Sequence, residues 1–164
     1  TDVPSVWLSP RSSNAVLKVK HGDNNEISLF TAPRAELLRG DISWSQLCGE
    51  SDQVTDFALI GDTIYLVTGK QAPRFKLVEM SLNDPDMASS RDVVPAGDLV
   101  IENVSVAADA LYISAKRDGI GMVMRWAPDV GLEELSPPRG GATYLSSIAP
   151  DIPVSYTHLT LPTT

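Results

Sequence analysis

Short runs of alternating apolar and polar residues recur along the chain and form three similar segments, Asn14–Phe30, Asp62–Val78 and Asp109–Arg125. Each segment starts with a polar residue and has two alternating runs separated by a polar turn, a pattern typical of paired β-strands. The starting positions lie 62 − 14 = 48 and 109 − 62 = 47 residues apart. We therefore expect Asn14, Asp62 and Asp109 to be equivalent. A period of about 40–50 residues built from short strands is typical of β-propeller blades.

The flanks of each segment repeat as well, so that every unit has four expected strands, as a propeller blade does. An apolar stretch precedes each segment and a short outer stretch follows it. The preceding stretches are Val6–Leu8, Val54–Ile60 and Val100–Val106, and the following ones are Ile42–Leu47, Asp92–Val94 and Leu132–Leu135.

The predicted fold class is all-β, a partial β-propeller occupying residues 1–152 in which the ring is not closed. We expect about three four-stranded antiparallel blades, at approximately residues 1–48, 52–96 and 98–138, and the start of a further blade at residues 142–152. One helical turn is expected at Pro33–Leu38, where Gly40 ends it.

Composition supports a folded domain and excludes some classes of partner. Of 164 residues, 43% are hydrophobic, an ordinary fraction for a globular protein. The net charge of −8 argues against nucleic-acid binding, which needs clustered basic residues. No apolar run is long enough for a membrane span, and no signal-peptide pattern is visible at the N-terminus. We expect a soluble protein, cytoplasmic or periplasmic, and the single Cys48 does not decide between these compartments.

The C-terminal segment departs from the repeat. Residues 154–163, Val-Ser-Tyr-Thr-His-Leu-Thr-Leu-Pro-Thr, resemble the translation of a transposon-end adapter used in preparing sequencing libraries. Pro153 also fits the preceding codon. We therefore predict that residues 153–164 are a non-native tail and exclude them from functional reasoning. The alternative is a natural edge strand at Val154–Leu161.

Several motifs together resemble the propeller of the prolyl oligopeptidase family of serine peptidases. The most informative is Thr68, followed by Ala72-Pro73 and then by the turn Asp84-Pro85, with Gly69 standing where Asn is usual in the family. Three other stretches also resemble the family, in the right order: the turn His21–Glu26, Trp44, and Val93–Pro95 followed by Asp98–Val106. The Ala-Pro turn favours prolyl oligopeptidase over oligopeptidase B.

The resemblance implies a catalytic α/β-hydrolase domain elsewhere in the parent protein, with a Gly-x-Ser-x-Gly nucleophile elbow. The present chain lacks that motif, so we expect no catalytic, cofactor-binding or metal-binding residues in it. Its expected partners are the parent's own α/β-hydrolase domain and, in the parent, a peptide substrate. The expected function is substrate gating in an endopeptidase that cleaves short proline-containing peptides. The alternative is a non-catalytic propeller that binds a protein or a small ligand.

Other residues with chemical potential have simpler structural interpretations. His21 precedes Gly22-Asp23 and could be drawn as part of a catalytic relay, but a turn histidine is the better interpretation. Cys48 lacks an adjacent basic residue and is expected to pack at a blade junction. The remaining candidates are expected to be turn, strand or surface residues: Arg39-Gly40-Asp41, the glycosylation sequon Asn103–Ser105, Gly119–Gly121, the alternating Met122 and Met124, and the paired acids Glu133-Glu134 and Asp84/Asp86.

The Ala72-Pro73 turn also gives a local prediction. Proline cannot donate to a strand ladder, so Thr68 should end one strand, residues 69–73 should connect, and Phe75 should lie in the next strand. We further expect Ile64, Leu66 and Leu77 to share one face of the sheet.

Overall fold

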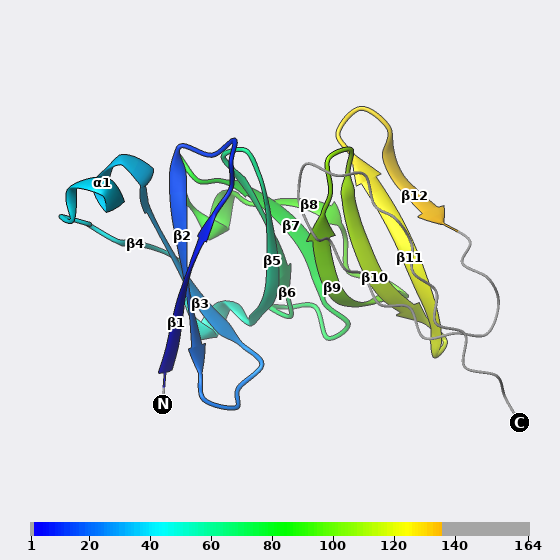
Figure 1. Cartoon of the computed structure of the whole chain (residues 1–164). Coiled ribbons are helices and arrows are strands. Elements are labelled where there is room, and N and C mark those ends of the chain that lie inside the picture. The colour runs from blue at the N-terminus through cyan, green and yellow to red at the C-terminus, as the bar shows by residue number, and fades with distance from the viewer. Residues whose placement is uncertain (1, 136–164) are drawn as a thin grey trace, which may run out of the picture.

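The computed structural model describes residues 2–135 and contains three four-stranded sheets that stand side by side in chain order (Figure 1). In every sheet each strand pairs in antiparallel fashion with the strand that follows it in the sequence. The first sheet contains β1 (Asp2–Leu8), β2 (Asn14–His21), β3 (Ile27–Pro33) and β4 (Ser45–Cys48). The second contains β5 (Val54–Ile60), β6 (Thr63–Thr68), β7 (Lys76–Ser81) and β8 (Arg91–Val94). The third contains β9 (Val100–Val106), β10 (Leu111–Arg117), β11 (Ile120–Ala127) and β12 (Gly131–Leu135).

These sheets are three blades of an open propeller, which confirms the predicted fold class. The expected start of a further blade at residues 142–152 and the tail at residues 153–164 lie outside the described residues. The expected helical turn is present as α1 (Arg34–Arg39). Gly40 ends it in a left-handed conformation, with φ of 76°, and its N–H donates to the Glu36 carbonyl oxygen at 3.0 Å. A glycine in this conformation is a common helix C-cap.

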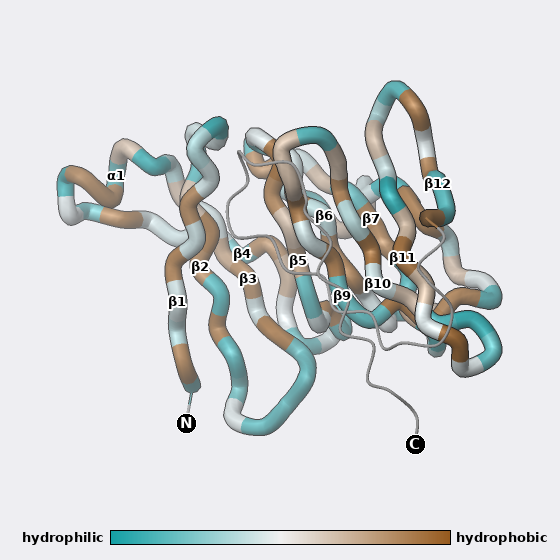
Figure 2. Tube along the Cα trace, turned by 45° about the vertical axis from the view of Figure 1, so that its right-hand side comes forward, coloured by the Kyte–Doolittle hydropathy of each residue, from teal (hydrophilic) through white to brown (hydrophobic). Residues whose placement is uncertain are grey.

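Two apolar cores hold the blades together, and each lies between neighbouring sheets. The core between the first and second sheets contains Val16, Leu29, Cys48, Leu66 and Val78, among others. The core between the second and third sheets contains Tyr65, Val67, Leu77, Ile113 and Trp126, among others. Figure 2 shows the hydrophobic stretches within the strands of all three sheets and polar residues in many of the connecting loops. Burial of apolar surface on both faces of the middle blade is therefore the main source of stability.

The first strand of each blade is its inner strand, because neighbouring blades meet there. The ring of Trp7 on β1 packs edge-on against the ring of Phe57 on β5, with centroids 5.4 Å apart. The N–H of Val104 on β9 donates to the Asp56 carboxylate on β5. The fourth strands, β4, β8 and β12, lie at the opposite edges of their sheets.

The structure corrects the alignment of the first repeat by one residue. In the first blade Val16 faces the second blade, and in the second blade Tyr65 faces the third. Each is also the third residue of the second strand of its blade, so the two residues are equivalent, and their separation is 65 − 16 = 49 residues instead of the expected 48. Because side chains alternate between faces, a slip of one residue exchanges them, so Ser13, not Asn14, is the equivalent of Asp62.

The turn after β6 confirms one local expectation and contradicts two. Thr68 ends β6 as predicted. Phe75, however, lies outside β7 and has a φ of 65°, because a second tight turn, closed by its N–H donating to the Ala72 carbonyl at 2.8 Å, precedes the strand. This turn sets a register in which Leu66 pairs with Val78 and Val67 pairs with Leu77. Leu77 thus lies on the face opposite to Leu66, and the predicted shared face was wrong.

Candidate functional site: the groove along the inner strands

The inner strands of the three blades line a groove of about 280 Å³. Its wall is mainly apolar and is contributed by all three inner strands: Trp7 and Leu8 from β1, Phe57 and Leu59 from β5, and Val104 and Val106 from β9. Trp7 and Leu8 keep about half of their surface exposed, at 50% and 53%. A tryptophan that is half exposed beside a groove offers a large apolar contact surface together with an N–H donor.

A smaller pocket of about 110 Å³ adjoins one end of this groove. It is formed by the turns that follow the three inner strands, at Ser9–Arg11, Ile60–Gly61 and Ala107–Ala110. Ser9, Leu59 and Val106 line both hollows, so the groove and the pocket are continuous. Because loops on a rigid scaffold are common positions for binding residues, this end of the inner strands is the candidate site.

Asp56 is the titratable residue that the three inner strands bring to the groove wall. Its Oδ2 accepts a hydrogen bond from the Val104 N–H at 2.9 Å. Burial raises the pKa of the Asp56 carboxyl above its usual value, although the N–H groups of Val104 and Phe57 and the charge of Lys18 act in the opposite direction. The carboxyl thus links β5 to β9, the inner strands of neighbouring blades. Sequence reasoning missed this residue, and its only signal was a charged residue within an otherwise apolar strand.

Asp62 joins the first and second blades in a different way. Its Oδ1 accepts from the Ser12 hydroxyl at 2.6 Å and the Ser13 N–H at 2.9 Å, and its Oδ2 accepts from the Ser13 hydroxyl at 2.8 Å. The Asn14 side-chain amide completes the cluster at 3.2 Å. These hydrogen bonds, the Ser12 bond first, lower the pKa of Asp62 to about 2. The polar residue that starts the second repeat is therefore a junction between blades.

His21 has different neighbours from those that the sequence suggested. Its Nε2 lies 2.8 Å from the Ser28 hydroxyl and its Nδ1 lies 3.2 Å from Asp2 Oδ1, whereas the sequence had suggested Asp23. The order of groups is that of a serine–histidine–aspartate relay. Ser28 is buried, however, and lines neither the groove nor the adjoining pocket. Catalysis would also need N–H donors directed at a substrate carbonyl oxygen. We interpret the three residues as a polar tie between β1, β2 and β3.

The other residues that the sequence singled out lie in a buried core, in a hairpin turn or in surface ion pairs, and not in a binding site. Cys48 is buried in the core between the first two blades, and burial raises the pKa of its thiol to about 12, so the reactive thiolate is disfavoured. Asp118 and Gly119 form the two-residue hairpin turn between β10 and β11 with positive φ angles, as a type I′ turn requires. Glu133 and Glu134 lie near Arg125 and Arg117, respectively, at 3.2 and 3.6 Å.

Residues 2–135 contain neither a cluster of metal-ligand residues nor a helix that could cross a membrane. No group of three or more His, Cys, Asp or Glu residues in that range is arranged to hold a metal ion. Within the same range, α1 and the short 3₁₀ turns fall far below the length and hydrophobicity of a transmembrane helix.

Three meandering four-stranded sheets, with their inner strands around a shared groove, place the chain in the class of β-propeller domains. The sequence profile of the prolyl oligopeptidase N-terminal β-propeller domain matches residues 20–146, which is most of the chain. The chain therefore belongs to the prolyl oligopeptidase family, as part of its propeller domain. No curated protein sequence matches the chain.

Solved structures agree on the fold. The chain is similar to a prolyl endopeptidase from a study of inter-domain dynamics in catalysis and specificity, with a TM-score of 0.74, 18% identity and coverage of 92% of this chain and 22% of that one. It is also similar to prolyl oligopeptidase B from Galerina marginata, with a TM-score of 0.69, 20% identity and coverage of 87% of this chain and 21% of that one. For oligopeptidase B from Leishmania major the TM-score is 0.67 and the identity 12%, with coverage of 85% of this chain and 21% of that one. The chain thus spans about a fifth of the length of these enzymes.

Proposed function

We propose that this chain is part of the substrate-gating propeller of a serine endopeptidase that cleaves short proline-containing peptides, and that the chain itself is catalytically inert. The observation that carries the proposal is the narrow groove between three inner strands, with Trp7 and Phe57 in its wall. A groove of about 280 Å³ acts by exclusion, since it accommodates a small segment of extended peptide and not a folded protein. Family membership supports the assignment to a peptidase.

In this proposal, catalysis belongs to an α/β-hydrolase domain of the parent protein. Nowhere in the sequence is there a Gly-x-Ser-x-Gly elbow, and the Ser28–His21–Asp2 tie lies away from the groove. The contribution of the propeller is steric, because it limits which peptides reach the nucleophile. Barrier lowering would come from the triad and oxyanion hole of the other domain.

The inertness of the chain is tested with a fluorophosphonate probe and a chromogenic proline-containing peptide. We expect neither labelling nor hydrolysis by the 164-residue chain, and labelling of the full-length parent at one serine outside this chain. Stoichiometric labelling of Ser28, abolished in the variant His21→Gln, would overturn the assignment of catalysis to another domain.

The gating role is tested in the full-length parent with Trp7→Ala, which enlarges the groove. We expect kcat/KM to rise for longer peptides relative to a short one, while the rate for the short peptide changes little. The control is Ile120→Ala, which truncates another exposed apolar side chain, at the tip of the β10–β11 hairpin and away from the groove, where Ile120 is 70% exposed. An unchanged ratio of long to short substrates would contradict gating. A parent without a serine-elbow domain would support the alternative, a propeller that only binds a ligand.

A further inference from the structure

The pocket that adjoins the groove is lined by Arg11, whose side chain is exposed. Within residues 2–135 the guanidinium of Arg11 makes neither a hydrogen bond nor an ion pair, whereas Arg91, Arg117 and Arg125 all pair with carboxylates. A guanidinium carries five N–H donors in a planar fork whose geometry matches a carboxylate. The pocket therefore contains donors that no other group of the described chain uses.

The sequence and its hydrogen bonds fix the turn that carries Arg11. Residues 9–12 form a β-turn, which is closed by the Ser12 N–H donating to the Ser9 carbonyl oxygen at 3.1 Å. Pro10 occupies the second position of this turn, where its fixed φ is favourable. The carboxylate of Asp62 then accepts from the Ser12 hydroxyl at 2.6 Å and from the N–H of the following residue at 2.9 Å. Because the turn is anchored at the blade junction, binding through Arg11 requires little ordering of the backbone.

The acidic residue of the same pocket is already occupied by other side chains. Asp109 lines the pocket, and its Oδ2 accepts from the Tyr112 hydroxyl at 3.1 Å and from Arg125 Nε at 3.2 Å. The whole protein has 21 acidic and 13 basic residues, so a shortage of carboxylates does not explain why Arg11 pairs with none of those described. The position of Arg11 leaves its guanidinium available to a ligand.

The groove and the pocket together suit a short peptide that ends in the pocket. Ser9, Leu59 and Val106 line both hollows. The groove of about 280 Å³ has an apolar wall, whereas the pocket of about 110 Å³ lies among the turns at one end of the blades (Figure 1). A pocket of this size accommodates a small end group and not a further chain segment. Trp126 and Pro128 give it an apolar side, and an ion pair is stronger beside such a surface than in open water.

We propose that Arg11 binds the C-terminal carboxylate of a short peptide whose preceding residues lie in the groove. This proposal rests on the proposed function, namely that the groove accepts short peptides. The guanidinium donates two parallel hydrogen bonds to the carboxylate oxygens, while Trp7 and Phe57 contact the apolar residues before the carboxylate. Arg11 is then a specificity-determining residue that favours peptides with a free C-terminus over amidated ones.

The test measures binding of the peptide Ala-Phe-Pro-Ala, labelled with fluorescein at its N-terminus, to the 164-residue chain by fluorescence anisotropy. We expect the free acid to bind about tenfold more tightly than the C-terminal amide. Arg11→Gln should remove this preference. Arg11→Lys should retain part of it, because an ammonium keeps the charge but lacks the planar fork. Raising the NaCl concentration from about 0.05 M to about 0.5 M should reduce the preference of the wild type, because salt screens the ion pair.

Arg34→Gln is the matched control, because Arg34 is another exposed arginine of the first blade and lines neither hollow. This variant should keep the full preference for the acid. The melting temperature of Arg11→Gln should equal that of the wild type, since the guanidinium contacts no acidic group of the described chain. A lower melting temperature together with an unchanged preference for the acid would mean that Arg11 is structural, and would overturn the proposal.

The binding data separate a failure of this inference from a failure of the proposed function. Equal binding of the acid and the amide by the wild type would overturn the role of Arg11 while leaving the groove as a peptide site. Absence of binding by both peptides would overturn the groove as a peptide site and the role of Arg11 with it. A third peptide, Ala-Phe-Pro-Glu amide, carries its carboxylate on a side chain, and binding as tight as that of the free acid would overturn the assignment to a C-terminus.

Discussion

Asp56 and Val104 connect the second and third blades through a single hydrogen bond of 2.9 Å between a side-chain carboxylate and a backbone N–H. The two residues are 48 positions apart and lie on neighbouring inner strands. The bond satisfies an N–H on the edge of β9 and fixes the position of β9 along its neighbour β5. Because this hydrogen bond holds two inner strands at a fixed separation, the groove between them does not depend on side chains that fill it.

The first prediction tests this bond. Asp56→Ala should destabilise the chain by about 1–3 kcal/mol, because it leaves the buried Val104 N–H without an acceptor. The free energy of unfolding of Asp56→Asn should stay near that of the wild type at neutral pH, since the asparagine side chain keeps an acceptor. Urea unfolding at pH 7 measures both variants. If Asp56→Asn were as unstable as Asp56→Ala, the interaction would depend on charge and not on the hydrogen bond.

The pH dependence of Asp56 provides a second test of the same residue. Its pKa is raised in the folded state, so folding favours the protonated form. Its contribution to stability should therefore decline as the pH rises from the unfolded value, about 3.9, through the raised folded value. Compared with Asp56→Asn, the wild type should lose relative stability over that window. Urea midpoints measured in steps between pH 3 and pH 7 determine the difference, and parallel curves for the two proteins would contradict a raised pKa.

Asp62 should have the opposite pH dependence. Its pKa falls from 3.8 to about 2 on folding, so its contribution is present above about pH 4 and is lost as the pH falls toward 2. Because the carboxylate is partly exposed, solvent screening should reduce this contribution to about 1 kcal/mol or less. Asp62→Asn should flatten the acid limb of the stability curve, whereas Asp23→Asn, in the exposed β2–β3 turn, should leave it unchanged. Equal acid limbs for all three proteins would exclude a role for the Ser12–Asp62 cluster.

The sequence predicted the number of blades, their strands and the open ring because hydrophobic alternation and turn residues are local signals. It misplaced features that depend on register. Phe75 was assigned to a strand because a second turn in a left-handed conformation leaves no hydrophobic signature. Leu77 was placed on the wrong face for the same reason, since one extra residue in a turn exchanges the two faces.

The candidate site was harder to predict than the fold. The groove consists of ordinary strand residues from three repeats, and Trp7 or Phe57 alone does not distinguish a groove wall from a core. The relation of His21 to Asp2 and Ser28 could not be predicted either, because it depends on the pairing of β1 with β2 and of β2 with β3. The role of Asp56 depends on the position of β5 beside β9 in the neighbouring blade, which no local sequence pattern shows.

The third prediction concerns the middle blade. Leu66 is fully buried between the first two blades, so Leu66→Asp places a carboxylate in an apolar core. It should cost about 3–5 kcal/mol or abolish folding, with loss of soluble yield and, in the full-length parent, of peptidase activity. Leu66→Met is the volume-conserving control and should cost less than about 1.5 kcal/mol.

Lys70→Ala, in the turn of the same hairpin, was expected from the sequence to change little. The structure gives Lys70 an ion pair with Asp52 at 2.7 Å. Burial raises the pKa of Asp52, but hydrogen bonds from Lys70 and the Gly49 N–H outweigh it and lower the value overall. We expect a loss of at most about 1 kcal/mol, since Lys70 is half exposed, well below that of Leu66→Asp. A silent Leu66→Asp together with a severe Lys70→Ala would contradict the strand register.

The fourth prediction uses the thiol of Cys48 as a probe of the core between the first two blades. The thiol is buried and its pKa is raised to about 12, so a disulfide reagent should react slowly with the native chain at pH 8 and rapidly after unfolding in urea. The reaction rate then reports how often the two blades separate. Asp62→Asn should accelerate it if the Asp62 cluster closes that junction. Rapid labelling of the native wild type would show that the junction is open in solution.

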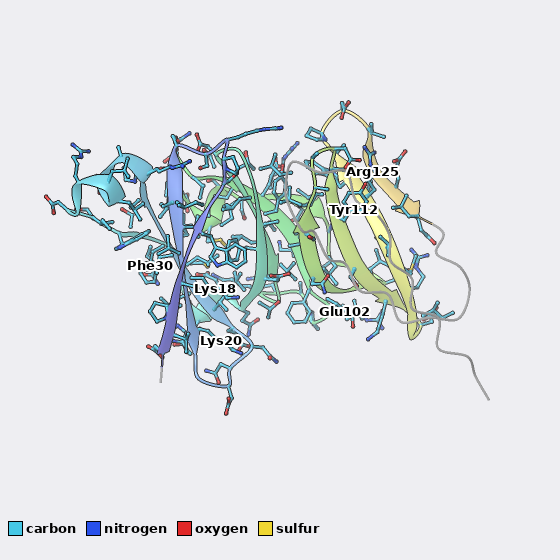
Figure 3. All side chains as sticks on the ribbon, in the orientation of Figure 1. Lys18, Lys20, Phe30, Glu102, Tyr112 and Arg125 are labelled. Carbon is cyan, nitrogen blue, oxygen red and sulfur yellow. The ribbon has the colours of Figure 1, made fainter. Side chains whose placement is uncertain are left out.

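The last prediction concerns the outer face of the first blade. Val6, Leu17, Val19 and Phe30 lie on the side of the sheet opposite to Val16 and Leu29, and each is exposed or partly exposed. Figure 3 shows Phe30 on the side of the first sheet that points away from the second sheet. A contiguous apolar sheet face of this kind promotes association. The 164-residue chain should therefore bind a hydrophobic dye and elute from a sizing column as more than a monomer.

Phe30→Lys should reduce both dye binding and association, because it places a charge in the middle of that face while leaving the cores between blades intact. Ile120→Lys, on the exposed hairpin tip of the third blade, is the control for added charge and should reduce neither as much. In the full-length parent the same Phe30→Lys substitution should instead destabilise the protein, provided another blade covers the face. A monomeric wild-type chain with one sharp, reversible unfolding transition and no dye binding would show that this face does not associate.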